Sequence, residues 1–81
     1  MKHKISKKFR EAYAALSPSI RRLARKQYKL MHADLHHPSV SFEKLHTKSL
    51  CYSARVNQEY RALGYPDAFD GEEVIIWFWI G

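Results

Sequence analysis

The seven apolar residues near the end of the chain constrain its fold more than any other feature. Residues 74–80 read VIIWFWI, without a polar side chain among them. Because successive residues of a strand point to opposite faces, a continuous apolar run suits a strand that is covered on both faces. The run is far shorter than the roughly 20 apolar residues of a membrane-spanning helix. We therefore predict a strand in the middle of a sheet, with Trp77, Phe78 and Trp79 in the core rather than on a base-stacking surface.

Two amphipathic helices are predicted ahead of the sheet. Ser6 suits the N-cap of a first helix over residues 7–16, and Ser17 followed by Pro18 suits the start of a second helix that ends at residue 32 or 33. Apolar residues recur at helical spacing in both segments, so each helix has one apolar stripe. Residues 2–8 are too basic for a buried strand, although Ile5 could hold a short edge strand or an arm.

Beyond the second helix, the apolar period changes from 3.6 to 2, which indicates strands. Strands are predicted over residues 39–46, 50–56, 60–65 and 74–80, with a polar turn at 46–49 and a loop over 66–73. Two helices followed by four strands indicate an α+β fold, in which both helices pack on one face of a small antiparallel sheet. A chain of 81 residues suffices for one domain, over 1–81.

The stretch YSARVNQEYRAL, residues 52–63, predicts a hairpin in which two arginines face each other. With residues 57–59 as the loop, Arg55 pairs with Arg61, and the pairs on either side are Val56 with Tyr60 and Ala54 with Ala62. Alternation turns one set of side chains toward the core, namely Tyr52, Ala54, Val56, Tyr60 and Ala62. The other set points away from the core and consists of Ser53, Arg55, Arg61 and Leu63.

Two like charges directly opposite each other destabilise a pair of strands, so the arginine pair calls for an explanation. In one interpretation, the carboxylate of Glu43, on a neighbouring strand, bridges the two guanidinium groups. In the other, an RNA phosphate lies between the arginines, and Glu43 or His46 is positioned for proton transfer. Arginine suits the second role because its planar fork matches phosphate oxygens. RNA cleavage without a metal also needs a base, a cation and an acid.

The charge balance points to a polyanionic partner. Fourteen Lys and Arg against eight Asp and Glu give a net charge of +6, which indicates nucleic acid or an acidic protein surface, or serves solubility alone. A continuous basic ridge is predicted along the second helix at Arg22, Arg25, Lys26 and Lys29. The ridge is either a solvated helix face or an RNA-binding surface, to which Lys44 and His46 would add.

Neither a metal nor another cofactor is predicted. The chain has five histidines and one cysteine, Cys51, but none of them has CxxC or HExxH spacing. A single cysteine cannot form an internal disulfide, and the sequence has neither a signal-peptide pattern nor a membrane-spanning run. We therefore expect a protein of the reducing cytoplasm that does not contact a membrane.

Four segments after the two helices resemble the RelE/ParE superfamily of bacterial toxins from type II toxin–antitoxin systems. They are SFEKLH, YSARV, YRALG and VIIWFWIG, and the resemblance covers residues 9–81. It implies a small sheet with two N-terminal helices on one side, and a cognate antitoxin protein as partner. Many members of this superfamily are ribosome-dependent mRNA endonucleases that repress translation, whereas the ParE branch inhibits DNA gyrase.

The resemblance also implies roles for three residues. In the endonuclease branch, the arginine in the position of Arg61 contacts the scissile phosphate, with that of Arg55 close by, and Glu43 in FEKL matches a general base. Similar chains usually continue past WIG with a His and a Tyr that complete the catalytic set, while this sequence ends at Gly81. We therefore expect an mRNA endonuclease impaired by the lack of that tail. The alternatives are a gyrase inhibitor or an inactive antitoxin-binding homologue. We also expect a homodimer through the terminal strand.

Overall fold

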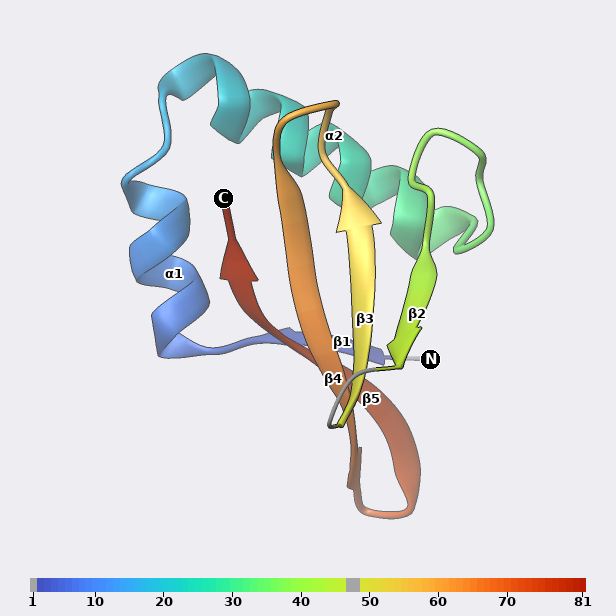
Figure 1. Ribbon diagram of the computed structural model, residues 1–81. Coiled ribbons are helices and arrows are strands. Elements are labelled where there is room, and N and C mark those ends of the chain that lie inside the picture. Colours follow the sequence, from blue (N-terminus) through green and yellow to red (C-terminus); the bar gives the residue numbers. More distant parts are fainter. Residues whose placement is uncertain (1, 47–48) are drawn as a thin grey trace.

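Two helices cover one face of a five-stranded sheet in the computed structural model, which describes residues 2–46 and 49–81 (Figure 1). The strand order across the sheet is β1-β5-β4-β3-β2. The elements are β1 Lys2–Ile5, α1 Lys7–Ala14, α2 Pro18–Ala33, β2 Glu43–His46, β3 Leu50–Arg55, β4 Arg61–Phe69 and β5 Glu72–Ile80. This arrangement confirms the predicted α+β fold with both helices on one face of the sheet.

Both helices begin where their capping residues predict. The Ser6 hydroxyl accepts a hydrogen bond from the backbone N–H of Phe9 at 3.1 Å, and the Ser17 hydroxyl accepts one from Ile20 at 3.4 Å. Helix α1 ends at Ala14, two residues earlier than predicted. The guanidinium of Arg21 donates to the carbonyl oxygens of Ala14 and Leu16, at 3.3 and 2.7 Å, and so satisfies acceptors at and just beyond the end of the helix.

The strand predicted over residues 39–46 is shorter in the structure and begins at Glu43. Two turns precede it, in which the backbone N–H of Val40 bonds to the carbonyl of His37, and that of Ser41 bonds to Pro38. Ser41 has a φ of 46°, which is incompatible with an extended strand. Val40 is only 1% exposed and therefore contributes to the core from a loop. The predicted turn at 46–49 includes residues 47–48, which lie outside the described residues.

The loop predicted over residues 66–73 is instead a long hairpin. Strand β4 continues to Phe69 and β5 already begins at Glu72, so that only Asp70 and Gly71 connect them. Both connecting residues have positive φ, 51° and 78°, as a type I′ turn requires. Asp-Gly is a preferred sequence for this turn, because its twist matches that of the flanking strands. The hairpin extends beyond the rest of the sheet (Figure 1).

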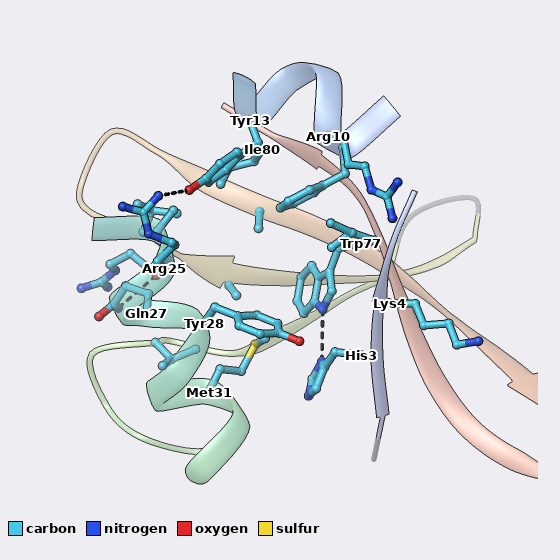
Figure 2. A pocket seen from close by; sticks show the side chains of 18 residues that line it. His3, Lys4, Arg10, Tyr13, Arg25, Gln27, Tyr28, Met31, Trp77 and Ile80 are labelled. Atoms are coloured by element: carbon cyan, nitrogen blue, oxygen red, sulfur yellow. Dashed lines mark hydrogen bonds between the residues drawn. The ribbon is translucent and has the colours of Figure 1, made fainter. Parts of the chain in front are cut away.

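A fifth strand, β1, runs parallel to β5 and makes the sheet mixed rather than purely antiparallel. It is the edge strand that Ile5 suggested. A side-chain hydrogen bond also joins the two strands, since the Trp77 indole N–H donates to Nδ1 of His3 at 3.1 Å (Figure 2). This bond lies next to a pocket of about 580 Å³ between the helices and the sheet. Since β5 has β1 on one side and β4 on the other, the prediction that residues 74–80 form an interior strand is confirmed.

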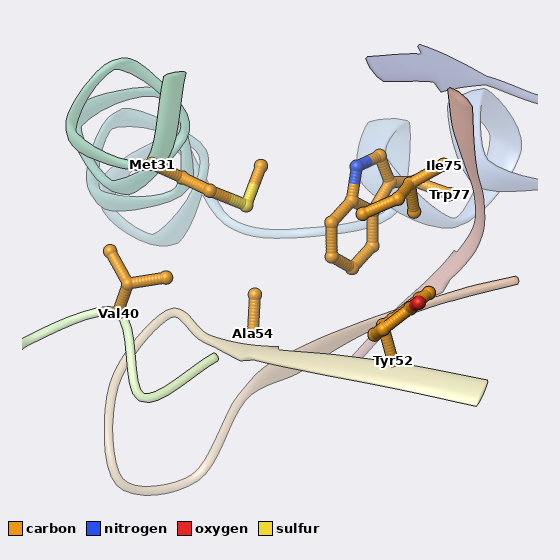
Figure 3. Close-up of a cluster of buried hydrophobic side chains, with 6 residues drawn as sticks. All are labelled: Met31, Val40, Tyr52, Ala54, Ile75 and Trp77. Carbon is orange, nitrogen blue, oxygen red and sulfur yellow. The ribbon is translucent and has the colours of Figure 1, made fainter. Parts of the chain in front are cut away.

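The core lies between the helices and the sheet. One buried cluster consists of Met31, Val40, Tyr52, Ala54, Ile75 and Trp77 (Figure 3). A second cluster joins Ala24 of α2 to Val56 and Ile80. The buried Gln27 side chain donates from Nε2 to the carbonyl oxygens of Ser39 and Arg55, at 2.9 and 3.1 Å. These two bonds tie α2 to the backbone of β3 at the residue where the arginine pair begins.

Candidate nucleic-acid interface

The predicted arginine pair is present in the structure. Strands β3 and β4 are antiparallel with Arg55 opposite Arg61 and Ala54 opposite Ala62. The loop between them is fixed by Asn57, whose side-chain oxygen accepts from the backbone N–H groups of Glu59 and Tyr60, at 2.8 and 2.9 Å. This Asx-type turn sets the register, and the register sets which side chains share a face.

The two arginines lie on the face of the sheet that has no helix. Tyr52, Ala54 and Val56 are buried beneath the helices, and alternation turns Arg55 and Arg61 to the opposite side. In Figure 1, α2 crosses behind β3 and β4, so that this second face is turned toward the reader. Arg61 is exposed and Arg55 is half-buried. A ligand can therefore approach both guanidinium groups without displacing a helix.

Ser53 is a part of this site whose role was not predicted. It lies two residues before Arg55 on the same face of β3, yet it is only 1% exposed. Its hydroxyl lies 3.3 Å from a terminal nitrogen of Arg61, which donates a hydrogen bond to it. The contact runs diagonally from β4 to β3 and orients the exposed guanidinium. Alternation along YSARV predicts the face of Ser53 but not its burial.

The interpretation in which Glu43 bridges the arginines is wrong. Glu43 is opposite Ser53 across β2 and β3, so it shares the face of the arginine pair. Within the described residues, however, Glu43 makes no ion pair, and a salt bridge is found only between Lys2 and Glu72, at 2.8 Å. No carboxylate among the described residues therefore neutralises the pair, and none of their basic side chains pairs with Glu43 on the same face.

Lys44 and His46 do not lie with the arginines. Lys44 is opposite Tyr52 and His46 is opposite Leu50, so both start from the helix side of the edge strand β2. The prediction that His46 could transfer a proton at the arginine pair is therefore wrong. The period of two along a strand places Glu43 on one face and its neighbour Lys44 on the other.

The basic ridge of α2 is a separate surface. Arg22, Arg25, Lys26 and Lys29 are all exposed and surround a shallow depression on the outer side of the helix. Because α2 covers the face opposite the arginine pair, the two basic surfaces lie on opposite sides of the molecule. Arg25 is held in place, since its guanidinium donates to the Tyr13 hydroxyl at 2.6 Å.

The pocket between the helices and the sheet has a different chemistry. It is lined mainly by apolar side chains, among them Tyr28, Met31 and Trp77 (Figure 2). At its edge, His3 accepts the hydrogen bond of Trp77 and lies near His32, with 5.7 Å between ring centroids. Burial, together with the nearby His32, lowers the pKa of His3 below its usual value. The neutral form of His3 is therefore favoured in the folded protein, where its ring lies between Trp77 of β5 and His32 of α2.

Two further properties describe the molecule as a whole. Among residues 2–46 and 49–81, no three His, Cys, Asp or Glu side chains are arranged to hold a metal ion. In the same part of the chain, neither helix has the length and apolar character needed to span a bilayer.

Comparison with solved structures identifies the fold. The YoeB/ParE toxin from Agrobacterium tumefaciens superimposes with a TM-score of 0.71 at 12% identity, covering 99% of this chain and 96% of the toxin. A chain of the archaeal RelE-RelB complex from Pyrococcus horikoshii OT3 superimposes with a TM-score of 0.67 at 20% identity. The match covers 98% of this chain and 90% of that chain. No family model matches the sequence, and neither does any curated protein. The chain therefore has the fold of the RelE/ParE toxins, as its sequence motifs predict.

Proposed function

We propose that this protein is the toxin of a type II toxin–antitoxin system and that it acts on ribosome-bound mRNA. The observation that carries the proposal is the pair Arg55 and Arg61 on the helix-free side of the sheet, which no carboxylate of residues 2–46 and 49–81 neutralises. A small domain keeps such a pair at a cost in stability. A phosphate between the two guanidinium groups converts that repulsion into attraction.

In this proposal, the arginine face contacts the scissile phosphate. Arg61 stabilises the negative charge that develops on the phosphate, and its hydrogen bond to Ser53 holds the guanidinium ready. Arg55 adds a second cation from the opposite strand. Glu43, which shares this face, would remove the proton of the attacking 2′-hydroxyl.

The remaining basic residues would bind RNA elsewhere. Arg22, Arg25, Lys26 and Lys29 on α2, with Lys44 and His46 on the helix side of β2, lie away from the arginine face. We assign them to contacts with ribosomal RNA, because a toxin that acts within the ribosome is surrounded by phosphates. Each phosphate contact adds roughly one unit to the slope of log affinity against log salt concentration.

The proposed partner in the cytoplasm is an antitoxin protein. The structure from Pyrococcus horikoshii is a RelE-RelB complex, which supports a comparable partner here. An acidic antitoxin segment would suit a protein with a net charge of +6. A homodimer through the terminal strand has little room, because β5 is paired with β4 along its length and with β1 over residues 74–77.

Induced expression and a cleavage assay test the proposal together. Expression of the wild type should stop growth, and a reaction with purified ribosomes should cut the bound message. The variant Arg61→Ala should do neither, whereas Lys8→Ala, which removes an exposed positive charge of α1 on the helix side of the sheet, should still stop growth and cut the message. Growth arrest without cuts in the message would refute the nuclease and leave a toxin of another kind.

A binder without nuclease activity is the second candidate, either a ParE-like inhibitor of DNA gyrase or an antitoxin-binding homologue. It is favoured by one observation. Among the described residues of the arginine face, no histidine accompanies Glu43 as a proton donor for the leaving oxygen. Inhibition of DNA supercoiling by purified gyrase, together with intact message on ribosomes, would establish the gyrase inhibitor.

A further inference from the structure

The arginine face carries an exposed aromatic ring whose position follows from an irregularity in β5. Leu63 is opposite Trp79, but the next residue of β4, Gly64, is opposite Trp77, so Phe78 is an extra residue without a partner. Such a bulge reverses the alternation beyond it. Trp77 is therefore buried on the helix side at 2% exposure, whereas Trp79 is on the arginine side and 44% exposed. The prediction that both tryptophans belong to the core is wrong for Trp79.

The indole of Trp79 covers the backbone position opposite Arg61. Gly81 is the next residue of the same face and is opposite Arg61, with backbone hydrogen bonds of 3.1 and 3.0 Å between them. A Cβ atom on Gly81 would lie 2.9 Å from Cζ2 and 3.1 Å from Nε1 of Trp79. The indole thus occupies the space that a side chain at position 81, opposite Arg61, would otherwise fill.

Aromatic and basic groups therefore follow one another across this face. Trp79 is on β5, Arg61 is on β4 and Arg55 is on β3, and neighbouring strands are about 4.8 Å apart. Half-buried Phe78 and exposed Tyr65 extend the aromatic part, with 5.8 Å between their ring centroids. Four of the eight acidic residues lie at the far end of the hairpin instead, namely Asp67, Asp70, Glu72 and Glu73.

The geometry points to a subsite in which an unstacked nucleobase of single-stranded RNA lies on the indole of Trp79 while the adjoining phosphate lies between Arg61 and Arg55. This subsite rests on the proposed function, because it presumes that the arginine face binds RNA. An exposed ring next to two cations is the combination that binds single-stranded nucleic acid. Any base has a face that can stack, so the subsite confers a requirement for a base rather than for a particular sequence.

The test is the binding of a short, fluorophore-labelled oligouridylate, measured by fluorescence anisotropy. Trp79→Leu should weaken binding between about 5-fold and about 150-fold, the range for loss of one stacked base, and Trp79→Phe should weaken it less. Phe69→Leu is the control, because Phe69 is as exposed, at 46%, but its ring lies under the ammonium of Lys4. An abasic ribose phosphate oligomer of equal length should bind the wild type as weakly as the oligouridylate binds Trp79→Leu.

Tryptophan emission provides an independent readout. The chain has two tryptophans, and only Trp79 is exposed, so oligouridylate should quench the emission of the wild type but not that of Trp79→Phe. Equal affinity of wild type and Trp79→Leu, with binding that still depends on Arg61, would refute the stacking subsite and leave the RNA-binding face intact. Absence of binding to both oligomers would overturn the proposed function, and the subsite with it.

Discussion

Replacing Arg55 by methionine should make the folded protein more stable. Methionine keeps an unbranched apolar stem of similar length, and within the described residues the guanidinium of Arg55 makes no hydrogen bond that would be lost. The change removes the repulsion from Arg61. A free energy of unfolding that increases on loss of a charged residue is unusual, since most substitutions destabilise.

The size of the effect follows from the register. Side chains directly opposite on neighbouring strands start about 5 Å apart, and two unit charges about 6 Å apart in water repel by about 0.7 kcal/mol. We therefore expect a gain of about 0.5 to 1 kcal/mol in the free energy of unfolding at low salt. With a urea dependence of about 1 kcal/mol per molar for so small a domain, the midpoint should rise by about 0.5 to 1 M.

Urea unfolding at two salt concentrations, followed by circular dichroism, measures this gain. At about 1 M salt the screening length is about 3 Å, so most of the gain should vanish. Lys44→Met is the matched control, because it removes one positive charge from the opposite face of the same sheet, where its partner is Tyr52. A gain equal to that of the control, or a loss of stability at low salt, would refute the view that the arginine pair is unneutralised.

Three further predictions concern the framework of the site. Gly64→Ala should lower the unfolding free energy by about 1 to 3 kcal/mol in urea titrations, since its Cβ would lie 2.7 Å from Cγ2 of Ile75. An unchanged unfolding free energy would show that Ile75 can move aside without cost. Asn57→Ala should lower the unfolding free energy by about 1 kcal/mol in the same titration, because the turn loses its side-chain acceptor. It should also weaken RNA binding, and unchanged binding would mean that the turn does not set the arginine register. The folded state binds a proton at His3 less readily than the unfolded state does, so stability should be full above the ordinary pKa of 6.5 and fall as the pH drops below it. His3→Asn should flatten this dependence in thermal unfolding at pH 7.5 and 5, and an unaltered slope would contradict the role of His3.

Local signals predicted much of the fold and the centre of the site. Ser6 and Ser17 mark the helix starts because capping depends on residues within one turn. The arginine pair was predictable because a loop of three residues and a period of two leave only one register that keeps both charges out of the core. The Asp-Gly turn at residues 70–71 also has a local signal, but it was masked by polar neighbours that suggest a loop.

Other features depend on contacts between distant parts of the chain. The parallel pairing of β1 with β5 joins residues more than 70 positions apart, and a basic segment of four residues carries no sign of it. The bulge at Phe78 decides that Trp79 faces solvent, yet the apolar run is continuous through it. The burial of Ser53 and its bond to Arg61 likewise follow from how the strands come together. These features distinguish the two faces of the sheet, so the details of the site were the least predictable part.

The most direct test of the account is to find which of the two basic surfaces binds RNA. A titration of ¹⁵N-labelled protein with a short single-stranded oligouridylate, followed by two-dimensional NMR, reports on each backbone amide and on both indole N–H groups. We predict that the largest shifts occur at Ser53, Arg55, Arg61 and the indole of Trp79. Shifts confined to the outer side of α2, around Arg22, Lys26 and Lys29, with the arginine face unchanged, would contradict the central claim.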